Sequence, residues 1–324
     1  MRKQHLSFVL AAAALTALAA APAHAQVART WVSAFGNDLN PCSRSAPCAT
    51  FSGAQTKTQA GGEISVLDAG GFGSITINKS LSIVADGIEG GVLAAFANGI
   101  VVNVTASDVV SLRGLQIEGA NSGLNGIKFT GAGTLHVENC VIRGFQAISA
   151  GNGHGIAFVP TGAGELDVTD TIIEKNGNGV VGGGILVKPA ANGSAKVSLS
   201  GVTLTHNTFG LKADGSTSTA PAGIQGGVYD STASGNAGTG FAAVTVNGFQ
   251  GVNLMLSHSA AYSNGTSAVS ANGAAATIRI SDFTATANGT GLSAVGGSAI
   301  VSHENNSISG NGTDGAPTQQ IGQL

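Results

Sequence analysis

The densest group of charged side chains in the sequence consists of His136, Glu138, Arg143 and Asp167. Side chains of these types could transfer protons at a sugar, or bind its hydroxyl and carboxylate groups. Hydrolysis of a glycosidic bond needs two or three carboxylates that converge on the cleaved bond, and here Arg143 interrupts them. We therefore treat these four residues as catalytic candidates only if the protein is an enzyme.

The same charges alternate in sign from one repeat to the next, which gives them a purely structural interpretation. The expected pairs and columns are Glu118–Arg143–Glu174, Arg113–Glu138 and His136–Asp167. Opposite charges on adjacent strands stabilise a sheet modestly. We favour an exposed ladder of ion pairs. The alternative is a sugar-binding surface, whose further candidates are Arg113, Glu118, Glu174 and two outward tyrosines, Tyr229 and Tyr262.

The remaining reactive side chains occur singly. Cys140 falls at an inward position, where a buried thiol is expected instead of a nucleophile. His154, between two glycines, is interpreted as a corner residue, and His206, His258 and His303 stand on separate repeats. No nucleotide loop or zinc spacing is evident, so we predict no tightly bound organic cofactor; calcium binding stays open, without supporting residues.

These side chains are positioned by a repeat. Its clearest copy runs from Leu166 to Asn176, with alternating apolar residues, a small turn residue, further apolar residues and a final Asn. Aligned copies end at Asn207, Asn236, Asn264, Asn288 and Asn311. Each interval suits one β-coil, so the sequence predicts an all-β fold: a right-handed parallel β-helix (solenoid) of roughly eight or more coils.

The alternation also predicts which side chains face inward. One inward column is expected at Leu112, Val137, Val168, Leu199, Val228, Leu256, Ile280 and His303. A second is expected at Ile117, Ile142, Ile173, Leu204, Ala233, Ala261, Ala285 and Ile308. The Asn column is expected to occupy left-handed corners, with side chains that bond the neighbouring coils.

The chain divides into four segments. Residues 1–25 read as a signal peptide, 26–62 as an N-terminal capping segment, 63–312 as the β-helix and 313–324 as a polar C-terminal tail. Residues 49–60 are expected to form a short capping helix with Phe51 and Ala54 inward, and Cys42 and Cys48 to form a disulfide. We expect export, to the periplasm or outside the cell, with no membrane span.

The capping segment carries a resemblance to a known family. The stretch RTWVSAFGNDLNPCSRSAPCATFSGAQ resembles the start of bacterial right-handed parallel β-helix proteins of the pectate-lyase-like superfamily. The matching residues are Val32, Ser33, Gly36, Asp38, Asn40, Pro41, Cys42, Pro47, Cys48, Thr50 and Phe51. The resemblance covers essentially the mature chain and implies the fold. A lyase of this kind would also show clustered Asp ligands for calcium beside a basic Arg or Lys, and that set is not found.

Three functions follow as hypotheses. The preferred one is a non-catalytic exported module that binds polysaccharide or serves the cell envelope. The first alternative is a lyase or hydrolase acting on a uronate-containing glycan. The second is an adhesive, fibre-like element that stacks end to end; the oligomeric state itself is not predicted. With a net charge of −3 and no basic block, nucleic acid is an unexpected partner.

Overall fold

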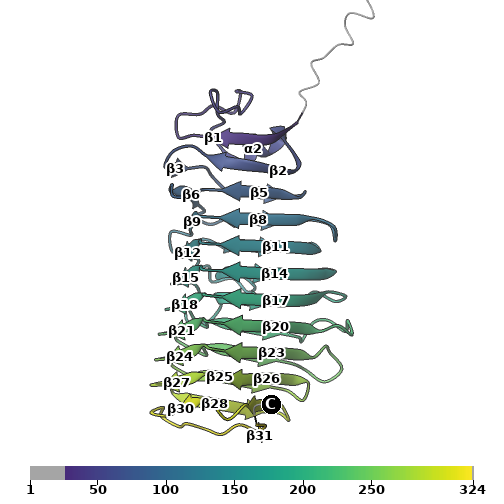
Figure 1. Ribbon diagram of the computed structural model, residues 1–324, viewed down its shortest axis with the longest axis vertical. Coiled ribbons are helices and arrows are strands. Elements are labelled where there is room, and N and C mark those ends of the chain that lie inside the picture. Colours follow the sequence, from purple (N-terminus) through teal and green to yellow (C-terminus); the bar gives the residue numbers. More distant parts are fainter. Residues whose placement is uncertain (1–25, 323–324) are drawn as a thin grey trace, which may run out of the picture.

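The protein is an elongated stack of coils, each built from three short strands (Figure 1). The computed structural model describes residues 26–322, so the predicted signal peptide, residues 1–25, lies outside the described residues. The chain passes from a twelve-stranded front sheet to a ten-stranded side sheet and then to a nine-stranded rear sheet before it returns. Every pairing between successive coils is parallel, and the coils number about nine. The predicted parallel solenoid is confirmed.

The strands follow one another in a fixed order around each coil. The front sheet contains β1 (Val27–Val32), β2 (Thr58–Val66), β5 (Leu81–Val84), β8 (Val109–Arg113), β11 (Gly133–Glu138), β14 (Ala163–Thr169), β17 (Ser194–Ser200), β20 (Ile224–Tyr229), β23 (Val252–Ser257), β26 (Ala276–Ser281), β29 (Ala299–Ser302) and β31 (Gln319–Gln320). The side sheet contains β3 (Gly70–Gly71), β6 (Gly90–Leu93), β9 (Leu115–Glu118), β12 (Val141–Arg143), β15 (Ile172–Glu174), β18 (Thr203–Thr205), β21 (Thr232–Ser234), β24 (Ala260–Tyr262), β27 (Thr284–Thr286) and β30 (Ser307–Ile308). The rear sheet contains β4 (Ile75–Ile77), β7 (Ile100–Val102), β10 (Asn125–Phe129), β13 (His154–Phe158), β16 (Gly183–Val187), β19 (Leu211–Asp214), β22 (Phe241–Val244), β25 (Ser267–Asn272) and β28 (Thr290–Val295).

The core is a set of apolar columns that run through the stack. In the first predicted column, the seven apolar residues from Leu112 to Ile280 are all buried. The second column is buried from Ile117 to Ala285, and Ile308 at the last coil is half-buried. The prediction for His303 was wrong, because Ser302 pairs with Ile280 and takes the inward position. In this coil the inward residue is therefore one position earlier in the chain than the sequence pattern predicts.

Two tight corners turn the chain on either side of the side sheet. At the front–side corner a single left-handed residue recurs, such as Asn139, Asp170 or Asp230, with φ near +50°. At the side–rear corner the left-handed residue immediately precedes each Asn of the repeat; examples are Lys175 and His206. The expectation that the Asn residues themselves adopt the left-handed conformation was therefore wrong. The Asn side chain forms hydrogen bonds along the stack, and the residue before it adopts the left-handed conformation that turns the chain.

A ladder of buried Asn side chains ties the coils together at the side–rear corner. Asn236 Oδ1 accepts a hydrogen bond from the backbone N–H of Asn207 (3.0 Å), and Asn236 Nδ2 donates to the carbonyl of Leu204 (3.0 Å) and to Asn264 Oδ1 (2.8 Å). The same pattern repeats along Asn176, Asn207, Asn236, Asn264, Asn288 and Asn311. The ladder ends on Asp314, whose Oδ1 accepts from the backbone and side-chain N–H groups of Asn311. The predicted bonding between coils is confirmed.

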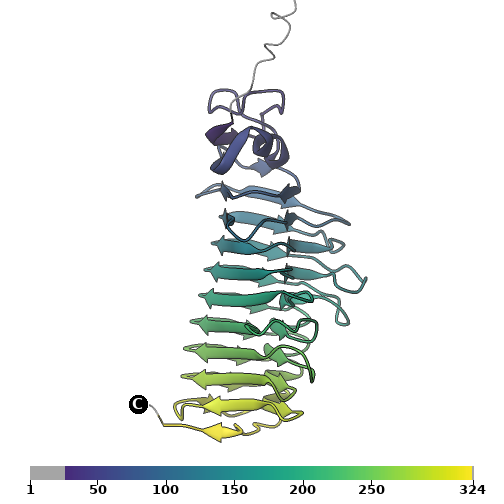
Figure 2. The same cartoon turned by 90° about the vertical axis from the view of Figure 1, so that its right-hand side faces the viewer.

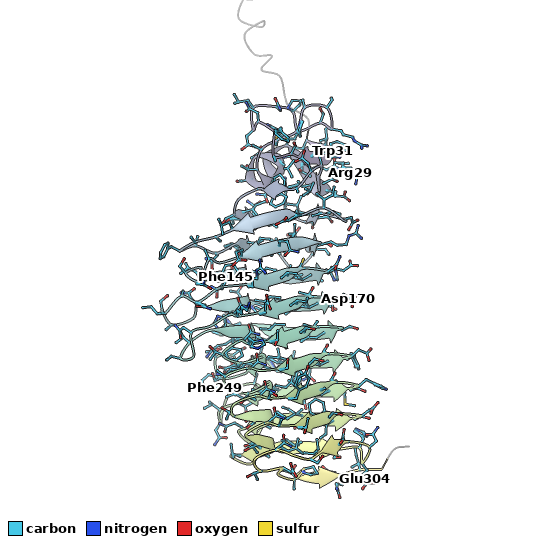
Figure 3. The ribbon with its side chains drawn as sticks, turned by 90° about the vertical axis from the view of Figure 1, so that its left-hand side faces the viewer. Arg29, Trp31, Phe145, Asp170, Phe249 and Glu304 are labelled. Atoms are coloured by element: carbon cyan, nitrogen blue, oxygen red, sulfur yellow. A yellow bond between two sulfur atoms is a disulfide. The ribbon has the colours of Figure 1, made fainter. Side chains whose placement is uncertain are left out.

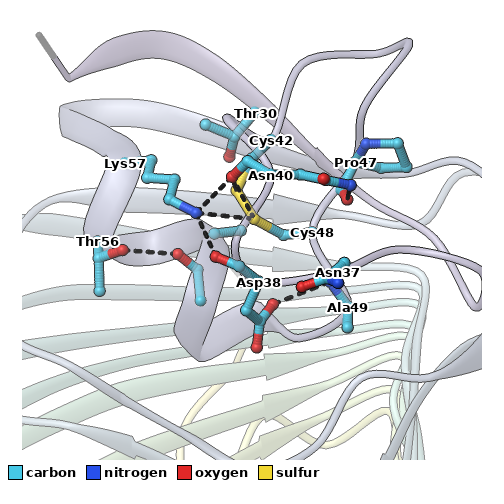
Figure 4. Close-up of a disulfide and its surroundings, with 12 residues drawn as sticks. Thr30, Asn37, Asp38, Asn40, Cys42, Pro47, Cys48, Ala49, Thr56 and Lys57 are labelled. Carbon is cyan, nitrogen blue, oxygen red and sulfur yellow. Dashed lines mark hydrogen bonds between the residues drawn. A yellow bond between two sulfur atoms is a disulfide. The ribbon is translucent and has the colours of Figure 1, made fainter. Parts of the chain in front are cut away.

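The N-terminal segment folds over the first coils. Helix α2 (Phe51–Lys57) begins at its cap Thr50, whose side chain accepts from the N–H of Gly53, and Phe51 and Ala54 are buried as predicted. The helix is shorter than predicted, since β2 begins at Thr58. The predicted disulfide between Cys42 and Cys48 is present, and Lys57 Nζ donates to two backbone carbonyls beside it (Figure 4).

The C-terminal residues also join the stack. Beyond residue 312, Thr313 bridges to Thr290, and β31 adds a last strand to the front sheet beside β29. At the other end of the molecule the disulfide-linked loops rise above β1 (Figure 2). Both ends of the stack therefore carry chain segments that do not repeat.

We predict that Asn236→Ala lowers the free energy of unfolding by about 1–3 kcal/mol, because it leaves the buried N–H of Asn207 without an acceptor. Asn253→Ala is the matched control: this side chain lies half-buried on β23 and makes no hydrogen bond to the described residues. It should change stability by less than about 0.5 kcal/mol. Denaturant unfolding monitored by circular dichroism measures both. Equal effects would show that the ladder adds nothing.

Candidate functional site

The four residues predicted as a patch do not converge. His136 on β11 and Asp167 on β14 face outward from the front sheet, with Nδ1 and Oδ2 3.0 Å apart. Burial raises the pKa of Asp167, and the nearby His136 opposes that shift. Arg143 lies on β12 in the side sheet, and Glu138 is an exposed residue at the end of β11. The structure therefore pairs His136 with Asp167 and places Arg143 around the front–side corner from them.

The predicted ladder on the side sheet is present. Arg143 Nε lies 2.5 Å from Glu118 Oε2, and Arg143 Nη1 lies 3.8 Å from Glu174 Oε1. The hydrogen bond and charge of Glu118 raise the pKa of Arg143. The prediction for Arg113 was wrong: it is in register with Glu138, but its guanidinium reaches back to the preceding coil and pairs with Asp86. The carboxylate of Asp86, two residues beyond β5, is the group that this long side chain meets.

The two tyrosines lie on different sheets. Tyr229 ends β20 in the front sheet, and Tyr262 ends β24 in the side sheet; both are exposed. The ring of Tyr229 lies over Gly227, where an added Cβ would come within 2.5 Å of it. Tyr229 therefore covers a neighbouring small residue.

A groove of about 460 Å³ lies on the side sheet beside the ladder. Glu118 and Arg143 line it together with Glu89, Leu93 and Gln116. Its floor includes Gly70, Gly71 and Gly91, which bring no side chains to fill it. Part of the predicted binding set thus faces a real depression, whereas His136 and Asp167 do not line it.

A second hollow, of about 420 Å³, lies on the rear sheet and was missed by the sequence analysis. His154, Lys188, Lys212 and Asp214 line it, with the apolar side chains Val180, Leu186 and Phe209. They come from β13, β16 and β19 and from the chain next to these strands. Three successive coils therefore supply two cations, one carboxylate and one imidazole to the same space.

Two lysines converge on one carboxylate in this rear-sheet hollow. Lys188 Nζ lies 3.1 Å and Lys212 Nζ 3.7 Å from Asp214 Oδ2, and the Asp214 side chain is only 7% exposed. Burial would raise the pKa of Asp214, but hydrogen bonds from the backbone N–H and Oγ of Ser216 and the charge of Lys188 outweigh it and lower the pKa. The three charged groups together carry one net positive charge.

His154 adds a neutral polar group to the rear-sheet hollow. Its Nδ1 lies 3.1 Å from Asn125 Oδ1, and its ring centroid is 5.9 Å from that of Phe209. Burial, assisted by the charge of Lys212, lowers the pKa of His154 to about 4. The imidazole is therefore uncharged at neutral pH.

The sequence contained a signal for this hollow. Strand β16 pairs with β19 so that Ile185 lies opposite Leu211 and Val187 opposite Ala213. One residue further along, the same register sets Lys188 against Asp214. An alignment of the glycine-led segments Gly184-Ile185 and Gly210-Leu211 would have shown this pair.

The remaining reactive residues, which occur singly in the sequence, do not belong to either hollow. Cys140 is buried, and burial raises the pKa of its thiol to about 11, in agreement with the predicted inert cysteine. His206 and His258 are left-handed corner residues. Between residues 26 and 322, no group of three or more His, Cys, Asp or Glu side chains is arranged to hold a metal ion. In the same part of the chain, no helix has the length and apolar character needed to cross a membrane.

Comparison with known proteins identifies the fold. No family model matches the chain, and no curated protein matches its sequence. Among solved structures, it is similar to the pectate lyase Pel9A, with 18% identity, a TM-score of 0.67, and coverage of 92% of this chain and 80% of that one. It is also similar to a rhamnogalacturonan lyase, with 12% identity, a TM-score of 0.52, and coverage of 89% and 88%. The chain thus has the right-handed parallel β-helix fold of these structures.

The lowered pKa of His154 makes a pH-dependent stability testable. The unfolded chain binds a proton at His near pH 6.5 and the folded chain only near pH 4, so this contribution is complete above about 6.5 and is lost as pH falls toward 4. Thermal unfolding should show a smaller acid-induced fall in Tm for His154→Gln than for the wild type between pH about 7 and about 4.5. His206→Gln, at an exposed corner, is the control and should follow the wild type. Identical slopes for all three proteins would contradict the assignment.

Proposed function

We propose that this protein binds an acidic polysaccharide on its rear sheet and holds it without cleavage. The observation that carries the proposal is the convergence of Lys188 and Lys212 on the single buried carboxylate of Asp214, inside a hollow. One carboxylate does not neutralise two ammonium groups. The pair therefore keeps a positive charge and N–H donors for an anionic group of a ligand.

The distribution of charge supports the rear sheet as the binding face. Lys128 and Lys212 lie in one outward column of that sheet, separated by Ala157 and Leu186. Acidic side chains instead gather at the front–side corner, where Asp170, Asp230 and Asp282 recur. Figure 3 shows Asp170 and Glu304 several coils apart on the same edge of the molecule. An acidic chain is attracted to one face and repelled from the other.

A polymer suits this surface better than a small anion does. Successive coils lie about 4.8 Å apart, so the rear sheet offers a regular row of positions along the molecule. Pel9A, which has the same fold, is by its name a lyase of pectate. Likeness of fold alone transfers no activity. It makes polysaccharides the first ligands to test.

The ion pairs support holding over cleavage. A lysine that removes a proton from a sugar must direct its amine at that sugar, whereas both amines here lie within ion-pair distance of the carboxylate of Asp214. The specific observation in favour of the alternative, a lyase or hydrolase, is the neutral imidazole of His154 in the same hollow. It is a candidate base, and the binding experiment below includes a search for cleavage.

Two structural features support the broader proposal of an exported module closed at its N-terminal end. Phe51 and Ala54 of α2 are buried, and the helix contacts β1, β2 and β4, which is how a cap covers an open core. The Cys42–Cys48 disulfide suits an oxidising compartment. We therefore propose a role outside the cytoplasm.

We predict that the wild-type protein binds polygalacturonate more tightly than dextran, and that higher ionic strength weakens this binding. Lys212→Gln and the double variant Lys188→Met/Lys212→Met should lose about tenfold or more in affinity, since about 1.4 kcal/mol corresponds to a factor of ten. Lys196→Gln is the matched control: this exposed lysine lies on β17 in the front sheet, outside the hollow. Isothermal calorimetry measures affinity, and circular dichroism checks folding. Equal losses in Lys196→Gln and Lys212→Gln, or no binding by the wild type, would refute the proposal.

The same mixtures test cleavage. We expect no rise in ultraviolet absorbance from unsaturated products and no new reducing ends, with or without calcium. Either signal would show that the protein cleaves the polysaccharide, and would contradict the proposal that it holds the chain without cleavage. In that event, His154→Gln and the combined alanine variant of His136, Glu138, Arg143 and Asp167 would tell which surface carries the chemistry.

A further inference from the structure

We infer that Phe96 is an aromatic platform on which a sugar ring stacks, and that it extends the binding surface beyond the lysine-containing hollow. The inference rests on the proposed function, because it names a second contact for the same polysaccharide. Phe96 lies in the loop from β6 to β7, at the side–rear corner. It belongs to an earlier coil than the hollow.

The conformation of Phe96 is costly to the fold. Its φ is +56°, in the left-handed region, and its side chain is 82% exposed. A left-handed conformation costs free energy in a residue with a Cβ, and an exposed ring gains little from burial in return. The next coil fixes this loop, because the carbonyl of Ala97 accepts a hydrogen bond from the N–H of Leu124 (2.8 Å). Left-handed residues such as Lys175 and His206 also turn this corner in later coils, but Phe96 is the one of these three that exposes a large apolar ring there.

Phe96 is one of three apolar loop tips at the same corner. Ile148 is 85% exposed and Val180 is 87% exposed, and both lie in later loops between the side and rear sheets. In the coil between those of Phe96 and Ile148, the equivalent loop presents the small residues Ala120 and Asn121. We call Phe96, Ile148 and Val180 the corner strip. Loops of the N-terminal half project from one side of the stack in Figure 2.

The corner strip is continuous with the proposed binding site. Val180 lines the rear-sheet hollow. Phe96 lies three coils earlier, about 14 Å along the axis at the usual strand spacing. On the other side of the corner, Leu93 immediately precedes the Phe96 loop and lines the side-sheet groove with Glu118 and Arg143. A ligand that leaves the hollow along the axis therefore meets the apolar tips next.

A carbohydrate fits this strip better than an apolar partner does. Each of these coils carries at most one apolar tip, and the small residues Ala120 and Asn121 interrupt the strip between Phe96 and Ile148. Sugar rings present C–H faces that pack on an aromatic ring, while their hydroxyls bond polar neighbours. A repeating, amphipathic chain can contact several tips and keep its charge near Lys188 and Lys212.

A length series of galacturonate oligosaccharides tests the platform. Short oligosaccharides should bind through the hollow alone, and Phe96→Ala should leave their affinity unchanged. Longer ones should bind the wild type more tightly, and Phe96→Ala should remove roughly three- to tenfold of that gain. Phe96→Trp should keep it. Phe35→Ala removes another exposed ring, 93% exposed, from the distant N-terminal loop and is the control.

A stability measurement separates the platform from a structural residue. Phe96→Gly should unfold at the same or a higher temperature than the wild type, since glycine adopts positive φ without strain, while it loses the length-dependent affinity. A drop in Tm together with unchanged affinity would overturn the inference. So would a length-dependent gain that Phe96→Ala retains. If the wild type binds no acidic oligosaccharide of any length, the proposed function itself fails.

Discussion

The backbone hydrogen bonds between successive coils are the constraint on which the rest of this structure depends. They fix each strand opposite its counterpart in the next coil, so that residues at equivalent positions form columns. A shift of one residue would turn the apolar set of a strand to the surface. Leu135, Leu166 and Val197 form such a column in the core, while His136 and Asp167 meet on the outside because the same register brings them together.

The same constraint creates the candidate site. Lys188 and Asp214 are far apart in sequence, but β16 and β19 are neighbours in the rear sheet. Three coils each contribute a polar side chain, and glycine and small residues nearby leave the space unfilled. Charged side chains of one sign gather on one face because each outward column consists of residues at the same position in successive coils. A rigid support of this kind suits recognition of an extended, repeating ligand.

The sequence indicated much of the fold because burial leaves a regular pattern. Val137, Val168 and Leu199 recur at the coil interval, and only an inward column explains them. The backbone angles at the corners leave a weaker pattern in the sequence than burial does. Lys175 and His206 adopt positive φ without being glycine, because the ladder of Asn side chains beside them holds the corner. The candidate site was harder to predict, because the repeat is clearest in the front and side strands, whereas Lys188 and Lys212 lie beside or on the rear strands β16 and β19. The exposure and strain of Phe96 leave no mark in a sequence.

The last link of the Asn ladder closes the column of amide side chains at its C-terminal end. Each Asn both accepts and donates, so its column has a direction and would continue for as long as further Asn residues were supplied. Asp314 accepts from Asn311 as the others accept from their neighbours, but an ionised carboxylate has no N–H to offer onward. Asp314 therefore acts as the terminal acceptor of the column. Oxygen in place of nitrogen at this one position therefore ends the relay of side-chain hydrogen bonds from coil to coil.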